Sequence, residues 1–194
     1  MLRGDASSPM VALTFDAGSG AEGTEDILAV LREHEVRATF FLTGDWVTKF
    51  PDLTKKIASD GHEIGNHSFT HPRFPEISDD QMISEVSRTE DLIRKLTGVS
   101  TKPLFRAPFG SYDARVLRVL RGLGYVNIHW TLDSTDWLTE STAKSIAEQV
   151  LGKTGNGFIV VHHASPGKTA EALKATVPGL KSKGFSLVPV SKLL

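Results

Sequence analysis

Two histidines, His67 and His71, stand four residues apart in the chain, close enough for both imidazoles to bind one metal ion. Gly65 and Asn66 before them and Pro72 after them indicate a short turn rather than one face of a long helix. The chain contains no cysteine, so a metal would have to be bound by His, Asp or Glu. We therefore predict a metal site here; the alternative is a pair of histidines with ordinary hydrogen bonds on a polar surface.

A carboxylate, Asp16, directly follows the apolar run 11–15, and the segment 17–23 after it is rich in glycine and small residues. Beside a metal, a carboxylate at a strand end can take a proton from metal-bound water, which makes Asp16 the candidate general base. Arg106 offers a guanidinium that would pair with Asp16, keep it ionised and orient it. The alternatives are a turn residue for Asp16 and a purely structural ion pair for Arg106.

Two further groups of polar residues follow later apolar runs. Asp133, Asp136 and Trp137 come after the fifth run, and His162 and His163 end the sixth. A histidine that donates a hydrogen bond to a carboxylate is stabilised in its protonated form, as a general acid requires. Each motif is weak alone, but all fall at strand ends, where the catalytic groups of a barrel gather. The roles of Asp133 and His162 remain open.

Seven short runs rich in β-branched and aromatic residues predict strands, and amphipathic helical patterns separate them. The runs are 11–15, 37–42, 63–65, 104–106, 125–130, 158–162 and 185–188. This alternation predicts an α/β fold with a parallel sheet, and seven repeats of the unit favour a barrel. Ser78 with Gln81 predicts a capping box that begins a helix ending near Gly98, and Pro178 should kink or shorten the last helix.

Length and charge limit the classes of protein. With 194 residues, 40% of them hydrophobic, the chain has enough apolar surface for one domain with a single core. The formal net charge is −1 and like charges form no long block, which argues against binding to nucleic acid or to an anionic membrane. No run approaches the length of a membrane span, and the first residues lack the apolar core of a signal peptide.

On these residues the chain resembles the polysaccharide deacetylase family, carbohydrate esterases of family 4 that share the NodB homology domain. The resemblance covers 11–194, after a lead-in of residues 1–10, and includes the stretches 38–44 and 61–68. It implies a distorted (β/α) barrel of about seven parallel strands in a single domain. It also implies a metal-dependent hydrolase that removes acetyl groups from an N-acetylated or O-acetylated polysaccharide, such as peptidoglycan, chitin oligomers or acetylxylan.

The resemblance assigns roles around the predicted metal. His67 and His71 correspond to the two metal-binding histidines, Asp16 to the general base, and Arg106 to the arginine that holds this base. The usual family motif has a second aspartate at position 17, which completes the metal triad, and this chain has Ala17 there. We therefore expect weakened binding of a divalent metal, with Zn as the first choice and Co, Ni or Mn as alternatives.

The resemblance also assigns the substrate pocket and the acid. Phe109 corresponds to the residue whose backbone N–H binds the oxyanion, Trp137 to the indole of the acetyl pocket, and Val161 to a position usually held by leucine. His163 corresponds to the general acid and Asp136 to the aspartate that tunes it.

The sequence offers two alternatives to a metal-dependent deacetylase. Loss of the aspartate at position 17 is also compatible with an inactive glycan-binding module. A serine esterase is disfavoured, because the chain has no Gly-x-Ser-x-Gly motif. The expected partner is an acetylated glycan, the expected state is a monomer, and the family implies an extracellular or cell-envelope location.

Overall fold

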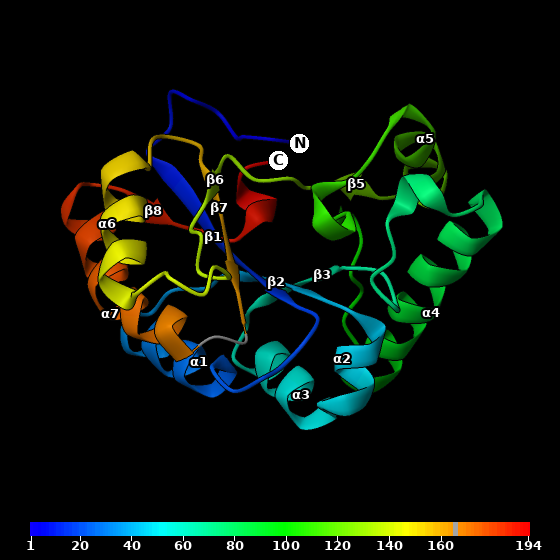
Figure 1. The fold of residues 1–194 in the computed structure, drawn as a ribbon, viewed down its shortest axis with the longest axis horizontal. Helices are drawn as coiled ribbons and strands as arrows, with labels where there is room; N and C mark the ends of the chain where they lie inside the picture. Colours follow the sequence, from blue (N-terminus) through cyan, green and yellow to red (C-terminus); the bar gives the residue numbers. More distant parts are fainter. Residues whose placement is uncertain (165–166) are drawn as a thin grey trace.

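The computed structural model describes residues 1–164 and 167–194, and in these residues eight strands form one curled parallel sheet (Figure 1). The strand order is β5-β4-β3-β2-β1-β7-β6, with β8 paired to the start of β1. The strands are β1 (Met10–Ala17), β2 (Thr39–Leu42), β3 (Glu63–Asn66), β4 (Leu104–Phe105), β5 (Val126–Asn127), β6 (Leu132–Asp133), β7 (Ile159–His163) and β8 (Ser186–Leu187). This arrangement confirms the distorted (β/α) barrel in a single domain.

The barrel is not closed by strand pairing, since no pairing joins β5 to β6 in the described part of the chain. The first residues cross this opening instead. The amino group of Met1 donates to Asn127 O at 2.5 Å, and Gly4 N donates to Gly157 O at 2.8 Å. The side chain of Thr131 also donates to Leu2 O, at 2.6 Å. The lead-in is therefore hydrogen-bonded to both edges of the opening.

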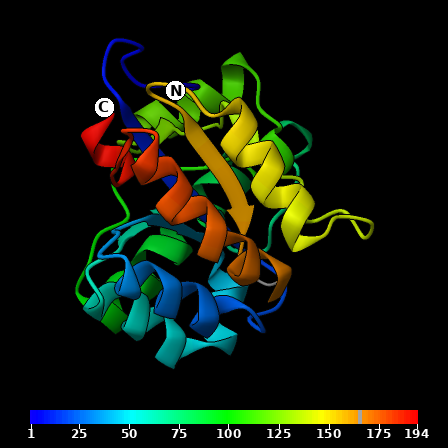
Figure 2. The same ribbon diagram turned by 90° about the vertical axis from the view of Figure 1, so that its left-hand side faces the viewer.

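Helices cover the outer face of the sheet. They are α1 (Thr24–Glu33), α2 (Gly44–Lys49), α3 (Pro51–Ser59), α4 (Asp79–Thr97), α5 (Ala114–Gly122), α6 (Ala143–Lys153) and α7 (Gly167–Ser182). Three short 3-10 helices lie at Phe74–Glu76, Pro108–Gly110 and Val190–Lys192. α7 packs against both α1 and α6, which lie on either side of it in Figure 2, and α4 packs against α2, α3 and α5. In the described residues, no helix is long and apolar enough to cross a membrane.

The sequence-based elements agree with the structure except at two places. All seven predicted strands exist, but β6 was missed, so the sheet has one strand more than expected. The capping box of Ser78 and Gln81 begins α4, and Gly98 ends it with φ of 76°. Pro178 was expected to kink or shorten the last helix, and it does not shorten it, because α7 continues through this residue to Ser182.

The alternation of side chains along β1 sets up the site. Successive residues of a strand face opposite sides of the sheet. Phe15 and Ala17 pack in the apolar core between the sheet and the helices. Thr14 and Asp16 face the barrel interior, where both accept hydrogen bonds from Arg106. At the end of β1, the side chain of Asp16 therefore lies at the mouth of the barrel, and that of Ala17 lies on its outer wall.

Candidate active site

A cleft of about 560 Å³ opens at the carboxyl ends of the strands. Its walls include seven of the predicted site residues, namely Asp16, His67, His71, Phe109, Trp137, Val161 and His163. The two others, Arg106 and Asp136, are fully buried behind this wall. Trp130 and Asp133 also line the cleft. Trp130 was not predicted as a site residue, although its place at the end of an expected strand was a usable signal.

The two candidate metal ligands face each other. The distance from His67 Nε2 to His71 Nε2 is 3.2 Å. His67 Nδ1 lies 2.8 Å from Arg106 O, and a carbonyl only accepts, so Nδ1 carries the proton and Nε2 has a free lone pair. Burial lowers the pKa of His67, and burial together with His67 lowers the pKa of His71 to about 4. Both rings are therefore neutral near pH 7, the form that binds metals.

This pair fits a metal only in part. Two nitrogens bound to one tetrahedral zinc at 2.0–2.1 Å lie about 3.3 Å apart, close to the observed separation. A third ligand is missing, because no group of three or more His, Cys, Asp or Glu within the described residues could hold a metal ion. Ala17, at the position of the family's third ligand, is 1% exposed and belongs to the apolar core.

The candidate base is held by a buried ion pair. Arg106 Nη1 donates to Asp16 Oδ1 at 2.7 Å and to Thr14 Oγ1 at 2.8 Å. Arg106 Nε donates to Ile128 O at 3.0 Å, which fixes the plane of the guanidinium. Burial alone would raise the pKa of Asp16, but the charge and hydrogen bond of Arg106, together with the nearby His67 and His163, hold that pKa below its usual value. The predicted ion pair is confirmed, with Asp16 ionised and oriented toward the cleft.

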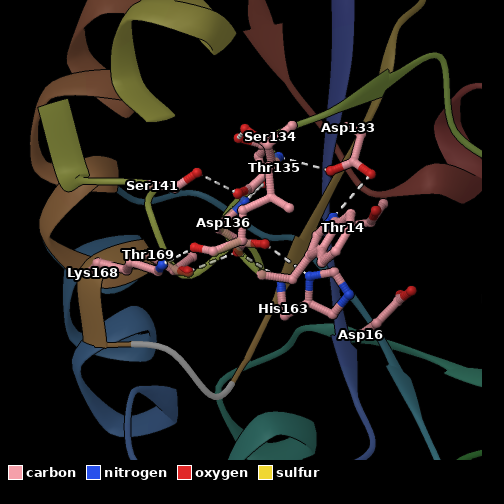
Figure 3. A network of polar contacts seen from close by, with 12 residues as sticks. Thr14, Asp16, Asp133, Ser134, Thr135, Asp136, Ser141, His163, Lys168 and Thr169 are labelled. Carbon is pink, nitrogen blue, oxygen red and sulfur yellow. Dashed lines mark hydrogen bonds and ion pairs between the residues drawn. The ribbon is translucent and has the colours of Figure 1, made fainter. Parts of the chain in front are cut away.

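The candidate acid rests on a second buried carboxylate (Figure 3). His163 Nδ1 lies 2.7 Å from Asp136 Oδ1, while the backbone N–H of His163 and the hydroxyl of Thr169 both donate to Asp136 Oδ2, at 2.8 and 2.7 Å. Burial would lower the pKa of His163, but the hydrogen bond and charge of Asp136 raise it above its usual value. His162 points the other way: its buried ring stacks on Phe15.

Two exposed aromatic side chains flank the opening. Phe109 and Trp137 are 56% and 58% exposed, unusual values for large apolar side chains. The ring of Phe109 packs against His71 at 4.5 Å, and its φ of 58° turns the backbone sharply at this point. Trp137 Nε1 donates to Asp133 Oδ2 at 3.3 Å, so this carboxylate orients the indole at the rim.

Comparisons with known proteins agree with this geometry. The family model described as "Polysaccharide deacetylase" matches residues 3–128. A peptidoglycan-N-acetylglucosamine deacetylase of Bacillus cereus is 35% identical over 187 residues, covering 94% of this chain and 67% of the relative. The crystal structure of the Bc1960 peptidoglycan N-acetylglucosamine deacetylase superposes with a TM-score of 0.94 at 32% identity, over 100% of this chain and 91% of that one.

A third relative carries a different description. BA3943 of Bacillus anthracis, described as a CE4 family pseudoenzyme, superposes with a TM-score of 0.94 at 32% identity, over 100% of this chain and 68% of that one. A mutant of BA3943 is described as having restored enzymatic activity, and its TM-score is 0.95 at 33% identity. With this fold and the family model on most of its length, the chain belongs to the polysaccharide deacetylase family.

Proposed function

We propose that the chain is a metal-dependent deacetylase that hydrolyses an acetyl group from a sugar of an acetylated polysaccharide. One observation carries this proposal: Asp16 and His163 are direct register partners on the adjacent strands β1 and β7. The same cleft therefore holds a carboxylate with a lowered pKa beside an imidazole with a raised pKa. Such a pair, with opposite protonation states near pH 7, is what acid–base hydrolysis of an amide or ester requires.

The residues divide the reaction between them. His67 and His71 would hold the divalent metal, zinc being our first choice; a bound metal polarises a carbonyl and acidifies water. Asp16, kept ionised by Arg106, takes a proton from the attacking water. The backbone N–H of Phe109 donates to the oxygen that becomes negative. His163 then donates its Nε2 proton to the leaving nitrogen or oxygen, while Asp136 holds the other ring nitrogen.

The pocket walls would accommodate the acetyl methyl group. Val161 and Trp137 supply apolar surface beside the acid. The described activity of the Bacillus cereus relative supports peptidoglycan as the first substrate to test, with chitin oligomers and acetylxylan next. It also supports action in the cell envelope. The chain spans only part of that relative, and we propose that this part acts as a monomer.

An inactive glycan-binding module is the second candidate. The observation in its favour is the missing third ligand at Ala17, since catalytic zinc sites normally have three protein ligands and a water. The description of BA3943 as a pseudoenzyme supports this alternative, because that protein has the same fold. The two candidates make opposite predictions for metal binding and for acetate release.

A calorimetric zinc titration of the metal-stripped protein separates them, with His67→Ala as control. A deacetylase should bind one zinc, lose this binding in the control, and release acetate from at least one acetylated glycan. Asp16→Asn should abolish this release without unfolding the protein. Absence of zinc binding at physiological concentrations, with glycan binding retained, would establish the binding module instead.

A further inference from the structure

In the loop that joins the two candidate ligands, side chains bind the backbone N–H groups. All four backbone N–H groups of residues 68–71 donate to side-chain oxygens. Glu85 accepts two of them at 2.7 Å each, Asn66 accepts one at 3.0 Å, and Ser68 accepts one at 3.1 Å. The loop therefore has the conformation that these side chains impose on it.

Glu85 makes the largest contribution to this set. It projects from α4 and is 9% exposed. Its Oε2 accepts from the N–H groups of Phe69 and Thr70, and its Oε1 accepts from the hydroxyl of Thr70 at 2.9 Å. Hydrogen bonds to an ionised carboxylate are stronger than those to a neutral acceptor. One buried carboxylate thus holds the middle of the segment between His67 and His71.

The loop needs such an anchor because its backbone is strained. Ser68 and His71 have φ of 66° and 61°, a region that residues other than glycine rarely adopt. Conformations of this kind persist only where the surrounding structure holds them. From the opposite side, the N–H groups at the start of α2, Gly44 and Asp45, donate to the carbonyls of residues 68 and 69 at 3.0 Å each. The loop is therefore held between α2 and α4.

We propose that Glu85 is a positioning residue that sets the approach of His67 Nε2 to His71 Nε2, and with it the affinity of this chain for a divalent metal. It touches neither imidazole and acts only through the backbone of residues 69 and 70. The part of the inference that concerns metal affinity rests on the proposed function. The part that concerns the placement of the two rings does not.

The same helix provides a matched control. Glu90 is 8% exposed and anchors a different loop in a similar way. Its carboxylate accepts from the N–H and the hydroxyl of Thr101 at 2.8 and 2.5 Å and from the hydroxyl of Ser100 at 2.7 Å. This second loop does not line the cleft. Glu90 also accepts from the hydroxyl of Tyr125 at 3.3 Å. Glu90→Ala therefore removes a comparable set of buried hydrogen bonds, none of which is made to residues 67–71.

The test is a titration with Co²⁺ followed by visible absorption, whose intensity and wavelength report the ligand geometry. It compares the wild-type chain with Glu85→Ala, Glu85→Gln and Glu90→Ala, each also with Ala17→Asp, which restores the residue that the family usually has at this position. Glu85→Ala should weaken cobalt binding by about 10- to 100-fold, the usual effect of losing a group that orients a ligand. Glu85→Gln, whose amide oxygen can still accept both N–H groups, should stay close to the wild type. Glu90→Ala should lower only the melting temperature.

Proton–nitrogen correlation spectra of the imidazoles in metal-free protein complete the test. Glu85→Ala should shift the ring signals of His67 and His71, and Glu90→Ala should not. If the chain binds no cobalt either with Ala17 or with Ala17→Asp, the proposed metal-dependent function is wrong. The spectra then still test whether Glu85 positions the two rings. Equal ring spectra in Glu85→Ala and the wild type would overturn the proposal, as would equal cobalt affinities in a background that binds.

Discussion

The two sides of the cleft hold their histidines in opposite protonation states. On the metal side, burial lowers the pKa values of His67 and His71 and keeps both rings neutral. On the acid side, burial acts in the same direction on His163, but the buried carboxylate of Asp136 outweighs it and raises that pKa. The hydrogen bond to Asp136, with the charges of Asp136, Asp16 and Asp133, therefore suits His163 to donate a proton, whereas His67 stays suited to bind a metal although Asp16 lies 3.8 Å from its Nε2.

The two sides also differ in completeness. Both carboxylate oxygens of Asp136 accept hydrogen bonds on the acid side: Oδ1 from the ring of His163, and Oδ2 from the backbone of His163 and from Thr169 in α7. These contacts join the end of β7 to α7, so Asp136 also stabilises the fold. The metal side has two candidate ligands, and Ala17 stands where the family usually has a third. Because Asp136 also has this structural role, its presence is weaker evidence of catalytic activity than the presence of both His67 and His71.

Replacement of Asp136 should have the largest effect, because it removes both functions of the acid side. For Asp136→Asn we expect a loss of about 1–3 kcal/mol in the free energy of unfolding, as when buried hydrogen-bonding groups lose a partner. The pKa of His163 should fall, and turnover should drop by about 10²- to 10⁴-fold. Urea unfolding and an NMR titration of His163 measure the first two effects.

Asp133→Asn is the control for that variant. Asp133 lines the cleft but is only half-buried, and its bonds are to Thr135 N and the Trp137 indole. The variant Asp133→Asn should leave the free energy of unfolding nearly unchanged. An unchanged pKa of His163 in Asp136→Asn would contradict the assignment of Asp136 as the group that tunes the acid.

Ala17→Asp should make the metal side as complete as the acid side, by providing the third candidate ligand. We expect zinc affinity to rise at least tenfold, equivalent to about 1.4 kcal/mol. Without metal the new carboxylate lies in the apolar core and should lower the melting temperature, since burial of an unpaired charge is unfavourable. Added zinc should then raise the melting temperature more in this variant than in the wild type. Calorimetric titration and thermal unfolding with and without zinc measure both effects.

Ala17→Asn, which has nearly the same size but no charge, is the matched control for Ala17→Asp. It should gain little zinc affinity. If Ala17→Asp destabilises the protein and zinc restores nothing, position 17 does not reach the metal site in this chain.

The sequence predicted those parts of the molecule that follow from periodicity and strand ends. Seven strands could be found by their apolar runs, and Asp16 and Arg106 met because the carboxyl ends of parallel strands share one mouth. β6 was missed because Leu132 and Asp133 follow the predicted run 125–130 without a turn signal between them. α7 continues through Pro178 because the neighbouring Val177 and Leu180 are fully buried, so that packing outweighs the lost backbone hydrogen bond.

Other features of the site leave no pattern in the sequence. Glu85 is an ordinary residue for an amphipathic helix, and its role depends on N–H groups of a loop with two positive φ values. The contrast between His162 and His163 depends on which face of β7 each residue occupies. A shift of one residue in register reverses these faces, so the apolar pattern of the run does not separate them. The family resemblance selected His163 as the acid, and the structure places His163 in the cleft and His162 in the core.

Acidification should act on the two sides in opposite directions. The pKa of His71 is lowered to about 4, so its contribution to stability is present above the unfolded value of 6.5 and is lost as the pH falls toward 4. The pKa of His163 is raised, so its contribution is present below 6.5 and is lost as the pH rises through the raised value. Each histidine changes the free energy of unfolding by at most about 1.4 kcal/mol per pH unit inside its window.

Urea unfolding of the metal-free protein between pH 7.5 and 4.5 tests this opposition. Relative to the wild type, His71→Gln should lose less stability on acidification, and His163→Gln should lose more. Burial also lowers the pKa values of His62, His67 and His162, so the wild type should lose stability over this range. Parallel curves for the two variants would show that the two sides do not differ in protonation.

The smallest effect is expected at His162, beside the acid but on the other face of β7. Within the described residues neither of its ring nitrogens has a hydrogen-bond partner, and the ring stacks on Phe15 with centroids 5.3 Å apart. A buried polar group without a partner is unfavourable, so His162→Leu should stabilise the protein by about 1 kcal/mol at pH 7. Because His163 keeps Asp136, acetate release should be unchanged, whereas His163→Leu should abolish it. A loss of stability in His162→Leu would instead show that this ring has a stabilising hydrogen-bond partner, such as an ordered water.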